Sequence, residues 1–221
     1  PLTPDQVLAL LNEGNQRWVS DKERNPNSTP QRREQTAAGQ NPFVTILTCA
    51  DSRLPVERIF DRGVGDVFVI RVAGNVAGQS ETGTIEYGVG HLKTPLLVVI
   101  GHTKCGAVAA AASGAQLQGK VADLVSAINP AVERVKRNNP GADDKQIAAL
   151  AVKENVWQSI FDLYKWSPEV RAATEALYCV HLDPEEFDRR VHDPVLEPFI
   201  DLCREQEARA LRILEAIDSG T

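Results

Sequence analysis

The sequence contains no methionine, and no apolar run in it approaches the length of a membrane-spanning helix. A spanning helix needs about 20 consecutive apolar residues, and a signal peptide needs an apolar core near its amino end. We therefore expect a soluble protein without a membrane partner, whose natural amino terminus was trimmed or processed. Its compartment is left open between cytoplasm and, if a signal was removed, periplasm, with a slight preference for the periplasm.

Positive charge is scarce as well. Lysine and arginine number 24 against 30 acidic residues, which gives a formal net charge of −6, and the basic residues are scattered among the acidic ones. Proteins that bind a phosphate backbone concentrate lysine and arginine on one face. Nucleic acid is therefore not expected as a partner.

Cysteine is too sparse and too widely spaced for a disulfide-stapled scaffold. For some of the cysteines, metal binding or catalysis is therefore a better prediction than a structural disulfide. The carboxyl-terminal pair Cys179 and Cys203 fits no standard zinc spacing, so packing roles are expected there. The chain has four cysteines: Cys49, Cys105, Cys179 and Cys203.

The 221 residues, 43% of them hydrophobic and 24% charged, have the composition of an ordinary globular protein. This length suits one domain. We expect an amino-terminal helix and arm over residues 1–42, an α/β core over 43–180 and a carboxyl-terminal helical segment over 181–221.

Four apolar or β-branched runs predict strands at Phe43–Thr48, Val67–Val72, Leu96–Ile100 and, more weakly, Leu177–Val180. Continuous apolar runs are typical of strands buried on both faces. Their alternation with helical patterns predicts a mainly parallel central sheet of four or five strands flanked by α-helices, with an amino-terminal helical arm. Helices are expected from Pro4 to Val19, at Gln31–Ala38, Val56–Phe60, Thr84–Leu92, Gly106–Ser113, Val121–Arg137 and Lys145–Tyr164, after Ser167, and at Val195–Ile217.

Reactive side chains follow the first and third predicted strands. Cys49 comes directly after one strand, and His102 and Cys105 follow the other. Because ligands gather beyond the carboxyl ends of parallel strands, these residues are expected to meet. Two thiolates and an imidazole favour zinc, and three protein ligands leave a fourth position open, as in catalytic sites. A single buried cysteine is more often a core residue than a metal ligand. The prediction of one zinc ion per chain therefore rests on the combination of both cysteines with His102.

Asp51 and Arg53 follow the first cysteine closely. Their spacing predicts a bidentate ion pair beside the metal, which would keep a carboxylate able to accept a proton from metal-bound water or to ligate the metal. The alternative is that Asp51 caps a helix that begins near Val56 and that Arg53 is an exposed loop cation. No role beyond a turn or cap is assigned to Ser52.

The order and spacing of these motifs resemble the β-class carbonic anhydrases. The likeness reaches from the first helix to about Ala176. It is carried by Cys49-Ala50-Asp51-Ser52-Arg53 and Gly101-His102-Thr103-Lys104-Cys105-Gly106-Ala107, together with Glu13–Trp18, Gly39–Pro42, Gly65–Asn75, Ile85–Tyr87 and Glu154–Val156.

The resemblance implies a zinc-dependent reversible hydration of carbon dioxide to bicarbonate and a proton. Zinc would be held by Cys49, His102 and Cys105, and the zinc-bound hydroxide would be aligned by a catalytic dyad of Asp51 and Arg53. The resemblance also implies a homodimer or tetramer, with some pocket residues reaching across the interface. The substrate pocket is expected to comprise Gln40, Phe68, Tyr87 and Gly106.

The sequence departs from the family pattern in two respects, and two alternative functions fit the same motifs. Ile46 stands where some members carry a tryptophan of an inhibitory bicarbonate site, so such control is not expected. The family's last strand motif is not recognisable beyond Leu177. The same zinc site could instead hydrolyse carbonyl sulfide or carbon disulfide. A non-catalytic, zinc-stabilised binding protein is a further alternative and would require a fourth protein ligand.

Overall fold

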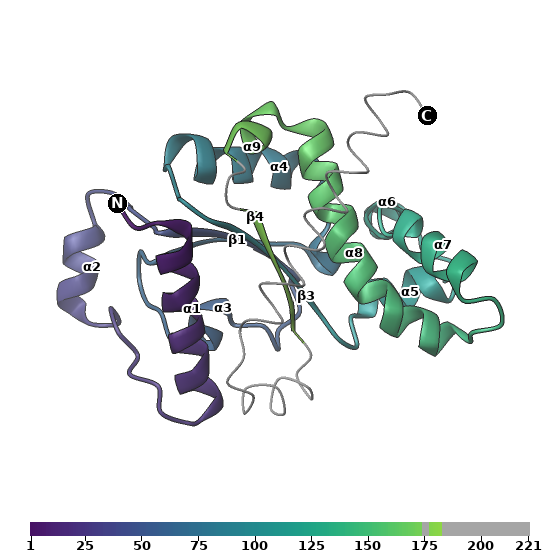
Figure 1. Ribbon diagram of the computed structural model, residues 1–221, viewed down its shortest axis with the longest axis horizontal. Helices are drawn as coiled ribbons and strands as arrows, with labels where there is room; N and C mark the ends of the chain where they lie inside the picture. Colours follow the sequence, from purple (N-terminus) through teal and green to yellow (C-terminus); the bar gives the residue numbers. More distant parts are fainter. Residues whose placement is uncertain (174–176, 183–221) are drawn as a thin grey trace.

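The structure is a computed structural model that describes residues 1–173 and 177–182 (Figure 1). The helix expected at Val195–Ile217 and the residue Cys203 lie outside the described residues. Within the described part, no helix combines the length and the apolar content that crossing a bilayer requires.

A parallel sheet lies at the centre of the molecule, with the strand order β2-β1-β3-β4. The predicted α/β class is therefore confirmed, including the weaker fourth strand, which forms one edge. The crossover that brings β3 back beside β1 is characteristic of parallel strands linked by helices. The strands are β1 (Val44–Thr48), β2 (Val67–Arg71), β3 (Leu97–His102) and β4 (Leu177–Leu182).

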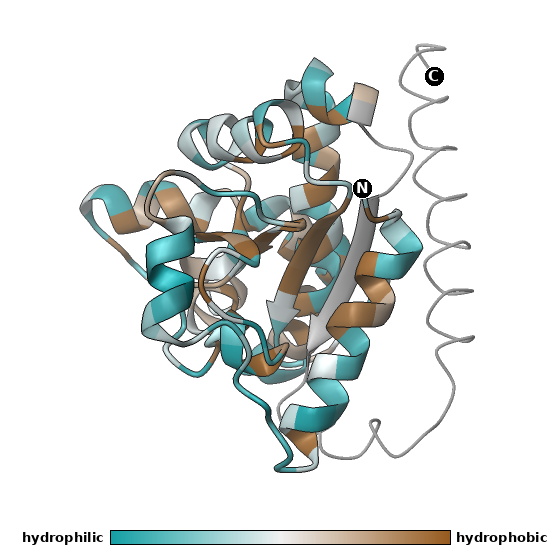
Figure 2. Ribbon diagram, turned by 90° about the vertical axis from the view of Figure 1, so that its left-hand side faces the viewer, coloured by the Kyte–Doolittle hydropathy of each residue, from teal (hydrophilic) through white to brown (hydrophobic). Residues whose placement is uncertain are grey.

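The two central strands are buried on both faces, which explains their continuous apolar sequences. Alternate residues of each strand face opposite sides of a sheet, so every second residue enters a different core. Val44, Ile46, Val98 and Ile100 belong to one apolar cluster, whereas Leu47, Leu97 and Val99 belong to the other. The central strands are accordingly mostly brown in Figure 2, with hydrophilic residues on the outer helical surfaces.

Helices cover the sheet and confirm most of the predicted helical segments. α1 begins with the expected capping box, in which Thr3 and Gln6 each accept a hydrogen bond from the other residue's backbone N–H. A short 3₁₀ turn, η1 (Ala73–Asn75), follows β2, and a π-helix, η2 (Tyr87–His91), precedes β3. The α-helices are α1 (Pro4–Val19), α2 (Pro30–Thr36), α3 (Val56–Ile59), α4 (Gln79–Glu86), α5 (Gly106–Ala112), α6 (Gly119–Ser126), α7 (Asn129–Asn138), α8 (Asp144–Trp166) and α9 (Pro168–Ala173).

Two helix predictions were wrong in detail. The single helix expected at Val121–Arg137 is two helices, α6 and α7, because Pro130 lies in the first turn of α7. Proline lacks the N–H that a continuous helix would need there, whereas a first turn tolerates it. The apolar period continues across the break, so the pattern alone predicted one helix. The segment expected as one helix at Thr84–Leu92 changes from α4 to the π-helical η2 after Glu86.

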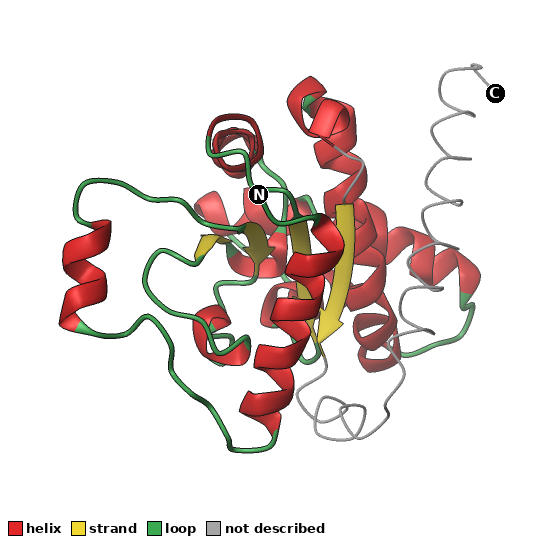
Figure 3. Cartoon of the chain, turned by 60° about the vertical axis from the view of Figure 1, so that its left-hand side comes forward, coloured by secondary structure: helices red, strands yellow, loops and turns green. Residues whose placement is uncertain are grey.

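The amino-terminal arm carries α2 on two long loops, at the left of Figure 3. Asp66, just before β2, fixes this arm. Its carboxylate accepts hydrogen bonds from Asn27 Nδ2 at 2.7 and 3.0 Å and from Arg32 Nη2 at 3.3 Å. The arm is thus tied to the sheet through side-chain contacts that no local sequence pattern predicts.

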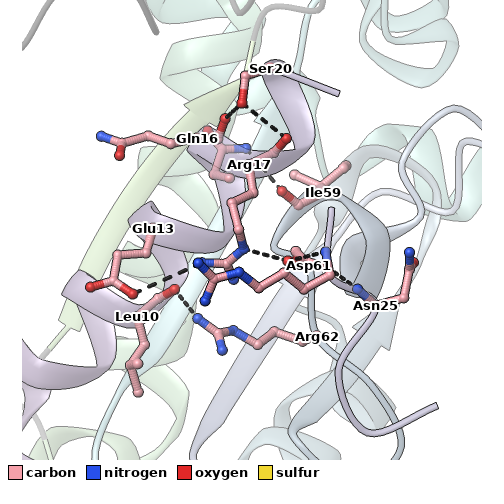
Figure 4. Close-up of polar contacts among 11 residues, drawn as sticks. Leu10, Glu13, Gln16, Arg17, Ser20, Asn25, Ile59, Asp61 and Arg62 are labelled. Carbon is pink, nitrogen blue, oxygen red and sulfur yellow. Dashed lines mark hydrogen bonds and ion pairs between the residues drawn. The ribbon is translucent and has the colours of Figure 1, made fainter. Parts of the chain in front are cut away.

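Asp61 fixes the end of α1 to the end of α3 (Figure 4). This carboxylate is 2% exposed and accepts hydrogen bonds from Arg17 Nε at 2.5 Å and from the backbone N–H groups of Arg24 and Asn25. Burial opposes ionisation, but Arg17 and the two N–H groups hold the pKa of Asp61 below its ordinary value. Asp61 is therefore a buried anion with a full set of partners.

Candidate metal centre

Three potential metal ligands meet at the carboxyl edge of the two central strands. Cys49 follows β1, His102 ends β3, and Cys105 is the N-cap residue of α5. The register pairs Thr48 with Ile100, so the two chain segments leave the sheet side by side. The structure thus brings together the three residues that the sequence spacing singled out.

Their geometry suits a tetrahedral metal ion. The potential ligand atoms all lie within 4.8 Å of one another, and the two sulfur atoms are 4.0 Å apart. Two thiolates bound to one zinc ion at about 2.3 Å would lie about 3.8 Å apart. Neither ring nitrogen of His102 has a hydrogen-bond partner among the described residues, although the side chain is buried. Because a buried imidazole without a partner is costly, a metal ligand role fits this side chain.

The two thiols differ in their tendency to ionise. The hydrogen bond from Cys105, helped by His102 and the N–H of Gly74, lowers the pKa of Cys49 to about 4 despite burial. The same bond to Cys49, together with burial, raises the pKa of Cys105. One thiolate therefore forms readily, whereas the second needs a cation. Metal ions supply such a cation, because they bind cysteine as thiolate.

Asp51 and Arg53 form the predicted bidentate ion pair. Arg53 Nε donates to Asp51 Oδ1 at 2.9 Å and Nη2 donates to Oδ2 at 2.8 Å. These bonds with Arg53 hold the pKa of Asp51 well below its usual range, so the carboxylate stays ionised. Asp51 Oδ2 lies 3.8 Å from His102 Nε2, which places the charge beside the ligand group. The capping alternative is wrong, because α3 begins at Val56 without any side-chain cap.

Two further contacts at the site were not anticipated from the sequence. Arg53 Nη2 also donates to the carbonyl oxygen of Lys104 at 3.1 Å, which links the Cys49 loop to the turn that carries Cys105. Arg71, at the end of β2, donates to the carbonyl oxygens of Cys49 at 3.2 Å and Asp51 at 2.5 Å. The strand end next to β1 thus holds the loop. Only the parallel register, which pairs Arg71 with Thr48, could have indicated this role.

Phe68 and Tyr87 lie together but away from the three ligands of the same chain. Their ring centroids are 5.9 Å apart, and Tyr87, which is 44% exposed, also stacks on His91. The register pairs Phe68 with Thr45, four residues before Cys49. Four strand residues span about 13 Å. Within one chain these aromatic rings are therefore at the other end of the sheet from the ligand group.

The remaining pocket candidates occupy different places. Gly106 is the first residue of α5, directly after Cys105, and a Cβ at this position would meet no atom of the described residues within 4 Å outside its own helix backbone and chain neighbours. The described part of the chain therefore leaves the space beside the ligand group open at this point. Gln40 is an exposed residue of the loop that leads from α2 into β1.

Comparisons with known proteins agree with this arrangement. The family model described as carbonic anhydrase matches residues 44–181. Carbonic anhydrase 2 of Mycobacterium tuberculosis is 45% identical over 133 residues, which are 58% of this chain and 64% of that protein. The match thus spans slightly less than two thirds of this relative's own length.

Solved structures resemble the fold as well. The β-carbonic anhydrase CafA of Aspergillus fumigatus superposes with a TM-score of 0.64 at 26% identity, covering 85% of this chain and 97% of that one. A tetrameric β-carbonic anhydrase of Sordaria macrospora gives a TM-score of 0.62 at 26% identity, with 82% and 94% coverage.

Proposed function

The chain belongs to the carbonic anhydrase family, and from this premise we propose that it catalyses the zinc-dependent, reversible hydration of carbon dioxide to bicarbonate and a proton. The observation that carries the proposal is a buried group of Cys49, His102 and Cys105 beside an ionised carboxylate, Asp51, both of whose oxygens accept hydrogen bonds from Arg53. A purely structural zinc site would have no need of this held anion.

Cys49, His102 and Cys105 would hold the zinc ion. A zinc ion bound by three protein ligands acts as a Lewis acid that makes water a nucleophile at accessible pH. The chain's contribution is to bring two cysteines and one imidazole together, to keep the Cys49 thiol ionised, and to leave space next to Gly106 among the described residues.

Asp51 would orient the attacking water. An ionised carboxylate only accepts hydrogen bonds, so it fixes the direction of a water O–H and with it the direction of the oxygen lone pair. Each carboxylate oxygen has more than one acceptor site, so the bonds from Arg53 leave capacity for the water. Arg53 keeps Asp51 from rotating towards the metal, and it also holds the Lys104 carbonyl of the neighbouring ligand loop.

A second copy of the chain would complete the substrate pocket. Phe68 pairs with Thr45, about 13 Å along the sheet from Cys49 of its own chain, and Tyr87 packs against Phe68, so these two rings can line a pocket only at a partner's site. We propose the same for the exposed Gln40. This arrangement requires at least a homodimer, and a tetramer such as that of the Sordaria macrospora relatives would also satisfy it.

Metal dependence tests this function. The purified protein is expected to contain one zinc ion per chain and to hydrate carbon dioxide in a stopped-flow indicator assay. Removal of the metal with a chelator should abolish hydration, and added zinc should restore it. A zinc-loaded protein without hydration activity would overturn the proposal, and hydrolysis of carbonyl sulfide in its place would identify the alternative substrate.

A further inference from the structure

The sulfur of Cys49 receives a backbone hydrogen bond from a distant turn. The N–H of Gly74, in η1, donates to Cys49 Sγ over 3.2 Å. Gly74 has a φ of 72°, in the left-handed region that favours glycine. A Cβ at this position would lie 2.7 Å from Ile128 Cδ1, so the turn is pressed closely against its neighbours. The direction of this N–H therefore depends on how the turn is held.

Helix α8 holds the turn through buried polar side chains. Asn155 Nδ2 donates to the carbonyl oxygen of Gly74 at 2.7 Å, and Ser159 Oγ donates to the carbonyl oxygen of Asn75 at 2.8 Å. Asn155 and Ser159 are each 1% exposed, and Asn75 is 2% exposed. Buried amides and hydroxyls are costly unless they are hydrogen-bonded, and the two donor groups here bond to consecutive carbonyl groups of one turn, whereas Asn155 Oδ1 has no hydrogen-bond partner among the described residues.

Packing alone gives no reason for an amide at position 155. The surrounding part of α8 is already anchored by buried apolar residues, including Val152, Val156 and Ile160, so an apolar side chain would serve the core equally well. Asn155 instead directs its donor to the residue whose own N–H reaches the sulfur. The two bonds form a continuous connection from α8 to Cys49.

We propose that Asn155 is a positioning residue of the metal centre: it fixes Gly74 so that the Gly74 N–H donates to the Cys49 thiolate. This inference rests on the proposed function in that it takes Cys49 as a metal ligand. A hydrogen bond to a thiolate withdraws electron density from the sulfur and fixes the direction of its remaining lone pairs. Asn155 thereby sets both the donor strength and the orientation of this ligand.

Cobalt-substituted protein gives a readout that does not depend on catalysis. In Asn155→Leu the Gly74 N–H should move away from Cys49 Sγ. Loss of this hydrogen bond raises the energy of the sulfur lone pairs. The thiolate-to-cobalt charge-transfer band should then shift to longer wavelength. Zinc affinity, measured by competition with a chromophoric chelator, should fall about 10- to 100-fold.

Gln158→Leu is the matched control, because it removes another buried amide from the same helix. Gln158 Nε2 donates to Asp162 Oδ1 at 2.8 Å and has no bond to the turn. This variant should lose stability without a shift of the band. An equal shift in both variants, or no shift in Asn155→Leu, would overturn the proposal.

Two further measurements keep the test decisive if Asn155→Leu does not fold. Ser159→Ala removes the neighbouring bond to the turn and should give a smaller shift in the same direction. In cadmium-loaded wild-type protein, the Gly74 amide proton should show scalar coupling to the metal through Cys49 Sγ, and absence of this coupling would refute the proposal. A wild-type protein that shows these signatures but no hydration would overturn the proposed function alone.

Discussion

The guanidinium of Arg53 binds both carboxylate oxygens of Asp51, at 2.9 and 2.8 Å, immediately beside the buried group of Cys49, His102 and Cys105. The pair is only partly buried, with side-chain exposures of 48% for Arg53 and 21% for Asp51. An exposed ion pair contributes little to stability. The pair is therefore not needed for the fold, which supports the proposed role of Asp51 at the metal centre.

Arg53→Ala should keep the fold and the metal but lower kcat/KM by about 10- to 100-fold, because the carboxylate is then free to rotate away from its orienting position. Stopped-flow hydration and zinc analysis check both parts. Arg58→Ala is the matched control, since the Arg58 side chain is exposed and its ion pair with Glu23 is long, at 3.9 Å. Equal activity of the two variants would contradict the role of Arg53.

Zinc binding should release about one proton from the thiol pair near neutral pH, because Cys49 is already ionised whereas the raised pKa of Cys105 keeps its thiol protonated without metal. Zinc affinity should therefore fall about tenfold for each unit that the pH is lowered between roughly pH 5 and 7. Calorimetric titration in buffers of different ionisation enthalpy measures the protons released. In Cys105→Ser this dependence should disappear together with most of the affinity.

Asp61→Asn should destabilise the protein by about 3 kcal/mol at neutral pH, because Arg17 then loses the anion that it binds in a buried position. The pKa of Asp61 is lowered in the folded state, so its stabilising contribution is complete above the unfolded pKa of about 3.9 and is lost as the pH falls towards the folded value. The difference from wild type should thus shrink under acid conditions. Urea unfolding at several pH values measures it.

A control for Asp61 is available on the surface. Asp123→Asn removes an exposed ion pair with Lys120 and should change the free energy of unfolding by less than about 1 kcal/mol at any pH. An Asp61→Asn difference that stays constant as the pH falls through the acid range would contradict the assignment of Asp61 as a buried, ionised anchor.

Mixed dimers test the proposed origin of the pocket. Tyr87→Ala should lower activity by weakening the pocket, and His102→Ala should abolish it by removing a ligand. Because Tyr87 is 44% exposed, its loss should cost little stability. A dimer that contains one chain of each variant regains one complete site only if Tyr87 acts on its partner's metal centre. Co-expression of differently tagged chains should therefore restore activity above that of either variant, and no gain would place Tyr87 elsewhere.

Local sequence patterns were sufficient to predict most of the fold and the three potential metal ligands. Continuous apolar runs predicted the buried parallel sheet. The two-residue gap between His102 and Cys105 predicted that one turn carries two metal ligands. Contacts between distant segments could not be deduced in this way. Asn155 and Gly74 are 81 residues apart, and their hydrogen bond depends on how α8 lies over η1. The break between α6 and α7 was missed because the apolar period continues across Pro130.

The position of Phe68 illustrates the same limit. A family resemblance implied a pocket role, but only the register with Thr45 shows that this ring lies far from Cys49 of the same chain. A sequence pattern has no information on which chain's site a side chain reaches. The proposal that a second copy completes the pocket thus depends on the structure.

The central claim, that an ionised Asp51 orients water at a zinc site for carbon dioxide hydration, is tested most directly by stopped-flow kinetics of Asp51→Asn against wild type at equal zinc content. The amide keeps the shape of the side chain but removes the negative charge and replaces one acceptor oxygen with a donor. We expect wild-type protein to hydrate carbon dioxide and the variant, with one zinc ion still bound per chain, to have kcat lowered at least about 100-fold. Undiminished kcat in the zinc-loaded variant would contradict the account.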